Sequence, residues 1–404
     1  MFDRLDRFIL LPAILISLIG ISMIFSATTS VDHRSSLYLM QLAWFSVGLA
    51  VLYFSAAAPP RLLHGIAIPL YVLIVLMLVA VLAFGAVKGS TRWIRLGPVG
   101  IQPSEFAKVV VILVLAQFLD RNRRNLHKPS VLITCFLIVG LPMALILKQP
   151  DLGTSLVFGA ILLGMLFWAG FNPLELLFIV SPVIGILICI ISGFNWVAWS
   201  VFIFVLFGLI YITRPPRWIA LTLFVIHLAV GVGAEPLWHS LHDYQRQRVV
   251  TFLDPQADAL GSGYQIIQSQ IAIGSGGLWG QGFRQGSQTQ LSFLPEQHTD
   301  FIFSVAGEEL GFAGTLTILG LFYLLVSRAI RVAGGVKSRY NCLVAGGCAS
   351  ALLFHVVMNI GMTLGLLPVA GVPLPFMSYG GSFLLTSMIL CGLLINMWRR
   401  RFEY

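Results

Sequence analysis

Long, nearly uninterrupted stretches of hydrophobic residues dominate the pattern of this chain. A helix needs about 20 mostly apolar residues to cross a bilayer, and nine stretches meet that length clearly, with three less certain ones between residues 173 and 240. The clear stretches are 8–27, 37–57, 65–86, 103–120, 130–147, 153–170, 302–327, 340–363 and 381–398, and the others are 173–192, 196–213 and 218–238. Because these stretches lack the two-residue alternation of outer-membrane strands, the pattern predicts an all-α polytopic membrane protein with about 10–12 transmembrane helices in a single transmembrane domain, 1–404.

The composition agrees with this fold class. Of the 404 residues, 58% are hydrophobic and only 10% are charged, and the mean hydropathy is +0.91. A soluble domain carries about 25% charged residues, and disordered chains are poor in apolar ones. The composition therefore excludes a soluble globular protein and a disordered one.

The basic residues predict the orientation in the membrane. The formal net charge is +9, from 25 Lys and Arg against 16 Asp and Glu. With the N-terminus inside and twelve alternating spans, sixteen basic residues lie inside and eight outside, and Lys108 lies within a span. Cytoplasmic loops carry the excess of Lys and Arg, so we expect both termini in the cytoplasm and no nucleic-acid partner.

The segment 239–301 is the longest polar stretch, and this orientation places it outside, before the last three spans. It holds eight glycines between Gly261 and Gly286. These match neither GxxxxGK[ST] nor GxGxxG, so they do not indicate a nucleotide site; we expect tight turns or close approach of the backbone to a ligand. We expect short interfacial or re-entrant helices here, in an extracytoplasmic catalytic region, because functional residues concentrate on loops.

Ionisable residues within or beside spans are candidate functional groups, because they are costly there. Glu105 and Lys108 in IQPSEFAK share one helix face by their three-residue spacing, either as a structural ion pair or in a polar cavity that holds a charged substrate. Trp93, in STRWIRLG, is either an interfacial aromatic residue or a substrate contact. Lys148 and Asp151 lie at the junction of two spans, where Asp151 either caps the next helix or belongs to a site.

Two further groups lie in or near the external segment. Glu296, His298 and Asp300 precede an apolar helix, which Asp300 or Thr299 would be able to cap. The three side chains also offer acceptors for a divalent cation, Mg²⁺ or Mn²⁺, with Asp300 and Glu296 as ligands, although their spacing is not a specific metal motif. In YQRQRV, Arg246 and Arg248 would both face one anion if the segment is extended.

Several long motifs, in this order along the chain, resemble the SEDS family of bacterial cell-wall proteins. They are STRWIRLG, QPSEFAK, KQPDLGTS, HDYQRQRV, LDPQADALGSGYQIIQSQIAIGSGG, LPEQHTDFIFSVAGEELG and GVPLPFMSYGGS. The glutamine-rich motifs YQRQRV and IIQSQIAIGSGG resemble the elongation branch of that family more than the division branch. SEDS proteins typically have ten spans, so 173–213 is interpreted as an extra helical hairpin.

The resemblance implies a peptidoglycan glycosyltransferase of the bacterial inner membrane that polymerises lipid II during elongation and cell-shape maintenance. Its implied partners are membrane lipids, the lipid II substrate and a class B penicillin-binding protein that crosslinks the strands. The essential aspartate of the family corresponds to Asp300, and Trp93, Glu105 and Lys108 correspond to other implicated residues. A lipid II flippase, and a scaffold that activates the penicillin-binding protein, are the alternative functions.

The chemistry of lipid II suggests one carboxylate base. Glycoside hydrolases use two carboxylates, one of which protonates a poor leaving group, whereas pyrophosphate is already a stable anion. Asp300 would therefore act as the base, or as a metal ligand. Substrate contacts are expected from His298, Asp151, Trp93 and the Glu105–Lys108 pair, with Lys148, Arg246, Arg248 or a divalent cation stabilising the pyrophosphate.

Overall fold

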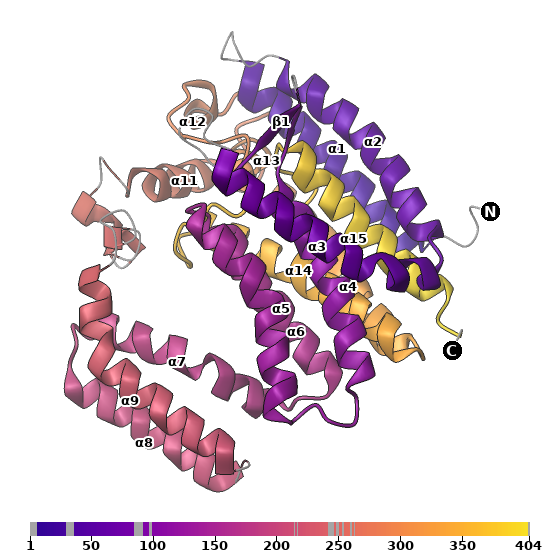
Figure 1. Ribbon diagram of the computed structural model, residues 1–404. Helices are drawn as coiled ribbons and strands as arrows, with labels where there is room; N and C mark the ends of the chain where they lie inside the picture. Colours follow the sequence, from indigo (N-terminus) through magenta and orange to yellow (C-terminus); the bar gives the residue numbers. More distant parts are fainter. Residues whose placement is uncertain are drawn as a thin grey trace. The chain divides into compact units, whose positions relative to one another are not determined.

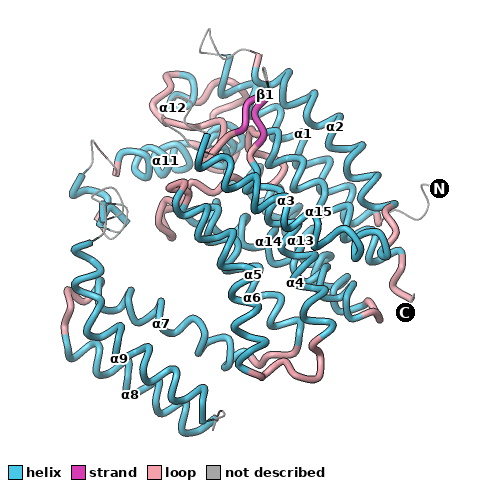
Figure 2. The backbone as a smooth tube through the Cα atoms, viewed as in Figure 1, coloured by secondary structure: helices cyan, strands magenta, loops and turns pink. Residues whose placement is uncertain are grey.

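The chain is an all-α polytopic membrane protein, and its described residues include one short β-hairpin (Figures 1 and 2). The structure, a computed structural model, describes residues 6–29, 36–84, 92–96, 99–213, 215, 217–240, 246–247, 250–252, 254–258, 261 and 263–402. The chain divides into two compact units. Unit 1 consists of 1–169 and 254–404, and unit 2 consists of 170–253.

Each predicted span forms a helix. In unit 1 these are α1 (Arg7–Thr29), α2 (Leu37–Ala57), α3 (Pro60–Phe84), α4 (Pro103–Arg121), α5 (Pro129–Lys148), α6 (Leu152–Ala169), α13 (Ile302–Gly335), α14 (Arg339–Thr363) and α15 (Gly381–Arg399). In unit 2 they are α7 (Pro173–Ile191), α8 (Trp196–Thr213) and α9 (Arg217–Ser240). Eleven of the described helices are long and apolar enough to cross a membrane; α4 is not among them, and it carries Glu105, Lys108, Asp120 and Arg121.

In unit 2, α7, α8 and α9 pack around Phe178, Leu206, Ile210 and Leu223. Its first helix begins at a capping box, in which Asn172 and Glu175 satisfy each other's backbone groups. The 173–213 segment forms α7 and α8 of this unit. That these two helices are an addition to the family pattern stays a prediction.

The two ends of the chain lie at the same end of unit 1 (Figure 1). Near the N-terminus, Arg328 at the end of α13 donates to the Asp6 carboxylate at 2.7 Å. Near the C-terminus, the backbone N–H of Lys337 donates to the carbonyl of Arg401 at 3.1 Å. The even number of spans predicted from the sequence would give this arrangement.

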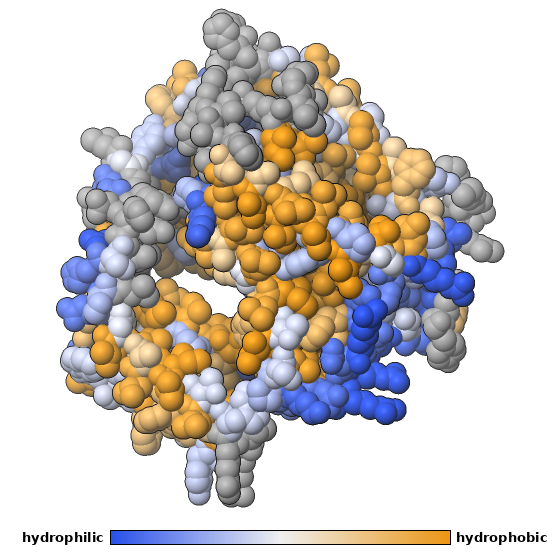
Figure 3. All heavy atoms as spheres, viewed as in Figure 1, coloured by the Kyte–Doolittle hydropathy of each residue, from blue (hydrophilic) through white to orange (hydrophobic). Residues whose placement is uncertain are grey.

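The interior of unit 1 is formed by α4, α14 and α15, in which most residues are buried. α14 packs against α13, α6 and α4, and α15 packs chiefly against α2. Hydrophobic residues cover much of the outer surface of the helices in Figure 3, as contact with lipid requires.

The helix α13 is broken at Gly311, where φ is 65° and ψ is −164°. Beyond the break, the N–H groups of Phe312 and Ala313 donate to the carbonyls of Gly277 and Leu278 at 2.9 and 3.0 Å. The glycine-rich segment therefore supplies the backbone partners that the interrupted helix lacks.

On the other side of the break, the N–H of Gln281 donates to the carbonyl of Glu308 at 2.9 Å. A Cβ atom on Gly280 would overlap the carbonyl of Glu309, and one on Gly311 would overlap the backbone of Gly280. The glycines therefore allow a close approach of the backbone, as predicted. The partner in this approach is the backbone of α13.

The described part of 239–301 also holds short helices: η2 (Pro255–Asp258), α11 (Tyr264–Ser275) and α12 (Ser287–Gln290). α11 packs against α13, where the hydroxyls of Ser269 and Ser304 lie 2.6 Å apart. The Glu308 carboxylate accepts hydrogen bonds from the N–H groups of Gln288 and Thr289 at 2.7 and 3.0 Å. Glu308 thus caps α12, which explains how a carboxylate is tolerated inside α13.

Candidate functional site

Asp300 lies in the turn that precedes α13, and this turn is fastened to the loop between α14 and α15. The side-chain amide of Asn359 donates to the carbonyls of both Asp300 and Val372, each at 2.8 Å. The hydroxyl of Ser378 donates to the carbonyl of Thr299 at 2.6 Å. The backbone of Asp300 is therefore held by the loop 364–380, while its side chain is partly exposed.

The carboxylate of Asp300 faces the same loop. A Cβ atom on Gly371 would stand 3.4 Å from its Oδ2 atom, so a glycine leaves the approach to this oxygen open. The N-cap position of α13 is Phe301. Neither Asp300 nor Thr299 occupies the capping position that the sequence had allowed for them.

Glu105 and Lys108 form a buried ion pair near the start of α4. Two hydrogen bonds, of 2.8 and 2.9 Å, join the ammonium group to the carboxylate, and the side chains are 3% and 1% exposed. The Lys108 Nζ atom also lies 3.1 Å from Nε2 of His355. The ammonium group is thereby provided with an acceptor for each of its three protons.

His355 connects this pair to the loop. Its Nδ1 atom lies 3.2 Å from the carbonyl of Pro373. A carbonyl can only accept and an ammonium can only donate, so the ring carries its proton on Nδ1 and presents the lone pair of Nε2 to Lys108. His355 and Asn359 are one turn apart on α14, and they bind consecutive loop carbonyls, at Pro373 and Val372.

The start of α6 touches the same loop. Asp151 caps this helix, because its Oδ1 atom accepts the N–H of Thr154 at 3.1 Å and its Oδ2 atom accepts the hydroxyl of Thr154 at 3.0 Å. Gln102, just before α4, donates to the same carboxylate at 3.3 Å. A Cβ atom on Gly153 would overlap the carbonyl of Ala370, so α6 begins directly against the loop.

A β-hairpin, β1 (Ile94–Leu96) and β2 (Val99–Ile101), lies just before α4. Arg92 donates from Nε to the carbonyl of Gln149 at 2.9 Å and from Nη2 to that of Pro150. It thus fastens the hairpin to the turn before Asp151. Trp93 is exposed beside it, and its ring covers Gly100.

The three predicted anion-binding residues are Lys148, Arg246 and Arg248. Lys148 is exposed at the end of α5, and it forms no ion pair with any described residue. Arg246 belongs to unit 2, where it donates to the carbonyl of Trp238 at 2.8 Å and to that of His239. Arg248 lies outside the described residues.

Glu296 and His298 differ in their surroundings. Glu296 is exposed, with a φ of 50°, and its carboxylate accepts the hydroxyl of Thr299 at 3.3 Å. His298 is buried, and its carbonyl accepts the N–H of Tyr379 at 2.9 Å. Burial also raises the pKa of Tyr379, so its phenol stays protonated at neutral pH. Within the described ranges, no three His, Cys, Asp or Glu side chains are grouped as a metal site requires.

His355, Asn359 and the loop between α14 and α15 were not among the sequence-based candidates. His355 is an ionisable residue inside a span, so the rule that identified Glu105 and Lys108 would have found it. Asn359 follows it by four residues, which places both on one face. The network thus joins Asp300, through Asn359, the loop and His355, to the buried pair on α4.

Comparison with known proteins identifies the family. The model of the FtsW, RodA and SpoVE family of cell cycle proteins matches residues 6–202 and 195–402. The peptidoglycan glycosyltransferase MrdB of Escherichia coli is 39% identical over 365 residues, which cover 89% of this chain and 85% of MrdB.

Two solved structures are also similar. A chain from a study of the structural coordination of polymerization and crosslinking by a peptidoglycan synthase complex has a TM-score of 0.71 and 29% identity, and the match covers 99% of both chains. The crystal structure of the rod shape determining protein RodA of Thermus thermophilus has a TM-score of 0.64 and 26% identity, and the match covers 99% of this chain and 98% of RodA. The chain therefore belongs to the FtsW/RodA/SpoVE family, the SEDS family that its motifs indicated.

Proposed function

We propose that this protein is a peptidoglycan glycosyltransferase of the elongation branch, which polymerises lipid II into glycan strands that maintain cell shape. The observation that carries the proposal is the Asp300 carboxylate, partly exposed on a backbone that Asn359 and Ser378 hold in place. The names of the relatives, a peptidoglycan glycosyltransferase and a rod shape determining protein, support the reaction and the branch.

The proposed location is the bacterial inner membrane, with both termini in the cytoplasm. The two-to-one excess of basic residues at that end supports this orientation. Asp300, at the other end of α13, then lies at the outer surface. This boundary suits lipid II, because its polyprenyl chain stays in the bilayer while its sugars lie outside.

In the proposed reaction Asp300 accepts the proton of the acceptor sugar's 4-hydroxyl. The freed oxygen attacks the anomeric carbon of the donor and inverts it, and the bond to the polyprenyl pyrophosphate breaks. The pyrophosphate departs with the electron pair and needs no proton. A positioned base contributes about 10²–10⁴-fold to such a step.

The surrounding residues have proposed supporting roles. Trp93 and His298 are proposed to contact the substrate, and Lys148 and Arg248 to attract the pyrophosphate. Arg246 would have to release the carbonyls of α9 to do so. The Glu105–Lys108 pair acts by positioning, because Lys108 is fully occupied by Glu105 and His355.

A divalent cation, Mg²⁺ or Mn²⁺, is the one cofactor that the sequence suggested. Asp300 and Glu296 do not belong to any group of three ligating side chains in the described part of the chain. No step of the proposed reaction depends on such an ion. Polymerisation in EDTA, with and without added Mg²⁺ or Mn²⁺, measures the requirement directly.

The test is polymerisation of purified lipid II in detergent by the purified full chain. Asp300→Asn keeps the size of the side chain and removes the base, so we expect the rate to fall about 10²–10⁴-fold. Glu296→Gln is the matched control, an exposed carboxylate four residues earlier, and we expect it to keep activity. Near-normal polymerisation by a well-folded Asp300→Asn protein would refute the base assignment.

The same assay separates this function from the other two. Detergent provides no second leaflet, so a flippase or a scaffold would yield no polymer there. The proposed partner is a class B penicillin-binding protein, a proposal supported by the similarity to a chain of a synthase complex in which polymerization and crosslinking are coordinated. If the chain is only a scaffold, Asp300→Asn would leave cell shape intact.

A further inference from the structure

A basic hollow lies at the end of unit 1 that carries the termini, away from Asp300. Its volume is about 560 Å³, within the range of small-ligand sites. The turn between α2 and α3, the start of α14 and the end of α15 line it. The lining residues that matter here are Arg61, His64, Ser338, Tyr340, Asn341 and Arg400, and none of the lining residues is acidic.

The two guanidinium groups give this hollow a positive charge, and its lining holds no carboxylate. Arg61 is exposed and forms no ion pair with any residue that the structure describes. Two nearby arginines have partners: Arg328 is paired with Asp6, and the guanidinium of Arg401 lies 4.4 Å from the centre of the Trp398 ring. Two cations that face one cavity favour an anionic ligand.

Asn341 adds a second, independent indication of a ligand. Its side chain lines the hollow and is only 4% exposed, yet no hydrogen bond to its amide is found among the described residues. The hydroxyl of Tyr340, which also lines the hollow, is buried without a hydrogen-bond partner among the described residues. A buried polar group without a partner costs about 1–3 kcal/mol, so a ligand that supplies one would bind favourably. Asn341 also lies in the first turn of α14, a 25-residue helix whose N-cap residue, Ser338, makes no side-chain cap bond; free N–H groups at such an end attract anions.

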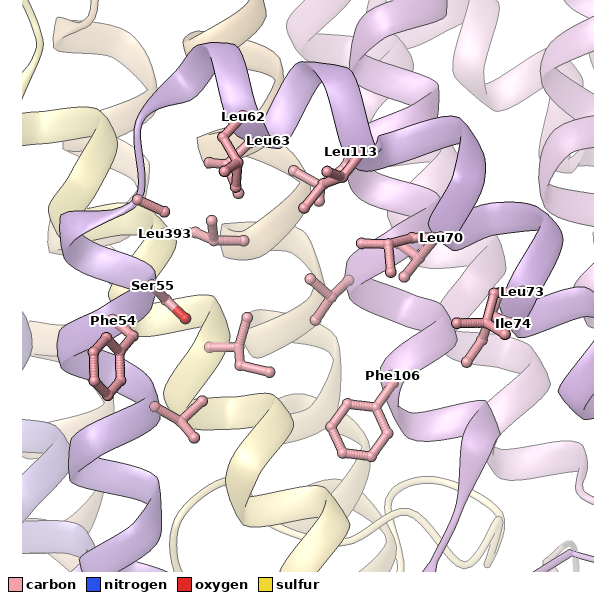
Figure 4. A pocket seen from close by; sticks show the side chains of 16 residues that line it. Phe54, Ser55, Leu62, Leu63, Leu70, Leu73, Ile74, Phe106, Leu113 and Leu393 are labelled. Atoms are coloured by element: carbon pink, nitrogen blue, oxygen red, sulfur yellow. The ribbon is translucent and has the colours of Figure 1, made fainter.

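An apolar groove of about 450 Å³ adjoins the same turn (Figure 4). Apart from Ser55, its lining is hydrophobic and comes from α2, α3, α4, α15 and Ala58. Ala58, Leu62 and Leu63 line the groove, whereas Pro59, Arg61 and His64 line the basic hollow. A ligand at this turn would therefore meet positive charge on one side and hydrocarbon on the other.

We propose that this end of unit 1 binds an anionic phospholipid, with its phosphate in the basic hollow and one acyl chain in the groove. Basic pockets between transmembrane helices are known sites for anionic headgroups. With the orientation proposed above, the lipid belongs to the cytoplasmic leaflet. Asn341 and Asn359 are eighteen residues apart on α14, about 27 Å, so this site is separate from that of Asp300.

The experiment is a lipid titration of the full chain in detergent, followed by native mass spectrometry. Phosphatidylglycerol is compared with phosphatidylcholine of the same acyl chains. We expect the double variant Arg61→Gln/Arg400→Gln to bind phosphatidylglycerol at least tenfold more weakly, with phosphatidylcholine binding unchanged. The control, Arg123→Gln/Arg399→Gln, removes the same charge from two residues outside the hollow and is expected to stay within twofold of the wild type.

A second arm distinguishes a lipid from free phosphate. Millimolar inorganic phosphate should displace phosphatidylglycerol only weakly, because it lacks the acyl chain. If inorganic phosphate displaces the lipid fully, the hollow binds a soluble phosphate and the lipid assignment is overturned. Equal losses in both double variants, or a loss in neither, would overturn the site itself. Unchanged thermal unfolding of both variants establishes that the fold is retained.

Discussion

The ammonium group of Lys108 on α4 lies 3.1 Å from Nε2 of His355 on α14, and the other nitrogen of that ring lies 3.2 Å from the carbonyl of Pro373. Because Lys108 also holds Glu105, a charge buried among the helices sets the position of the loop that faces Asp300. This relationship gives the pair a role that does not require contact with substrate.

Replacing one member of the Glu105–Lys108 pair should destabilise the protein more than replacing both. Glu105→Gln leaves the buried ammonium without a carboxylate, and Lys108→Met leaves the carboxylate without a cation. Each should lower the free energy of unfolding by about 3–5 kcal/mol. The double variant leaves no isolated charge, so we expect it to be more stable than either single variant in thermal unfolding in one detergent.

The double variant also separates the two interpretations of the pair. If the pair only positions the loop, polymerisation by the double variant should recover along with its stability. If the pair binds substrate, kcat/KM should stay low although the protein is folded. Destabilisation of the double variant by the sum of the two single effects would contradict the interaction itself.

His355→Leu should impair both stability and activity. It leaves the carbonyl of Pro373 and one proton of Lys108 unpaired, at about 1–3 kcal/mol for each buried group. His355→Gln is the conservative control, because its amide can donate to Pro373 and accept from Lys108. We expect the Gln variant to restore kcat for polymerisation, with KM for lipid II little changed; equal activity of the Leu and Gln variants would exclude the positioning role.

The helices were predictable from the sequence, and so was the Glu105–Lys108 contact, because both depend on local spacing. Continuous apolar stretches of sufficient length have few alternatives in a bilayer, and residues three apart on a helix meet wherever the helix packs. The break at Gly311 was not predictable in this way. Its partners, Gly277 and Leu278, are more than thirty residues away, and only the folded backbone brings them together.

The same distinction between local sequence features and long-range contacts applies to the candidate site. Asp300 was identified by its motif and its place before a helix, whereas the hold of Asn359 on Asp300 depends on α14 and the loop meeting in space. Arg246 illustrates the converse. Its charge indicated an anion site, yet its guanidinium satisfies carbonyls at the end of α9, a need that appears only once the helix end is known.

Gly311→Ala should disrupt the packing of α13 against the glycine-rich segment 274–286. The combination of φ 65° and ψ −164° is essentially restricted to glycine, at about 1–3 kcal/mol for another residue, and a Cβ atom would overlap Gly280. We expect a lower unfolding temperature and reduced polymerisation. Gly320→Ala is the matched control in the same helix, because a Cβ atom there meets nothing within 4 Å; it should be neutral or stabilising by up to about 1 kcal/mol.

Substitutions at Asp151 should distinguish capping from substrate binding. Asp151→Ala removes the acceptor for the N–H of Thr154 and should destabilise the protein by about 0.5–2 kcal/mol. Asp151→Asn keeps an oxygen that can cap and removes the charge. If the carboxylate serves mainly as a cap, thermal unfolding and the polymerisation rate should both stay near wild type in the Asn variant, while the Ala variant loses stability.

The stability measurement and the activity measurement test different parts of that prediction. A stable Asn variant with a much lower kcat/KM would show that the charge of Asp151 acts on the substrate, in addition to its cap. An Asn variant as unstable as the Ala variant would contradict the cap. Because α6 begins directly against the carbonyl of Ala370, loss of the cap should also loosen the loop at Gly371, so faster amide hydrogen exchange in 367–373 is expected for the Ala variant alone.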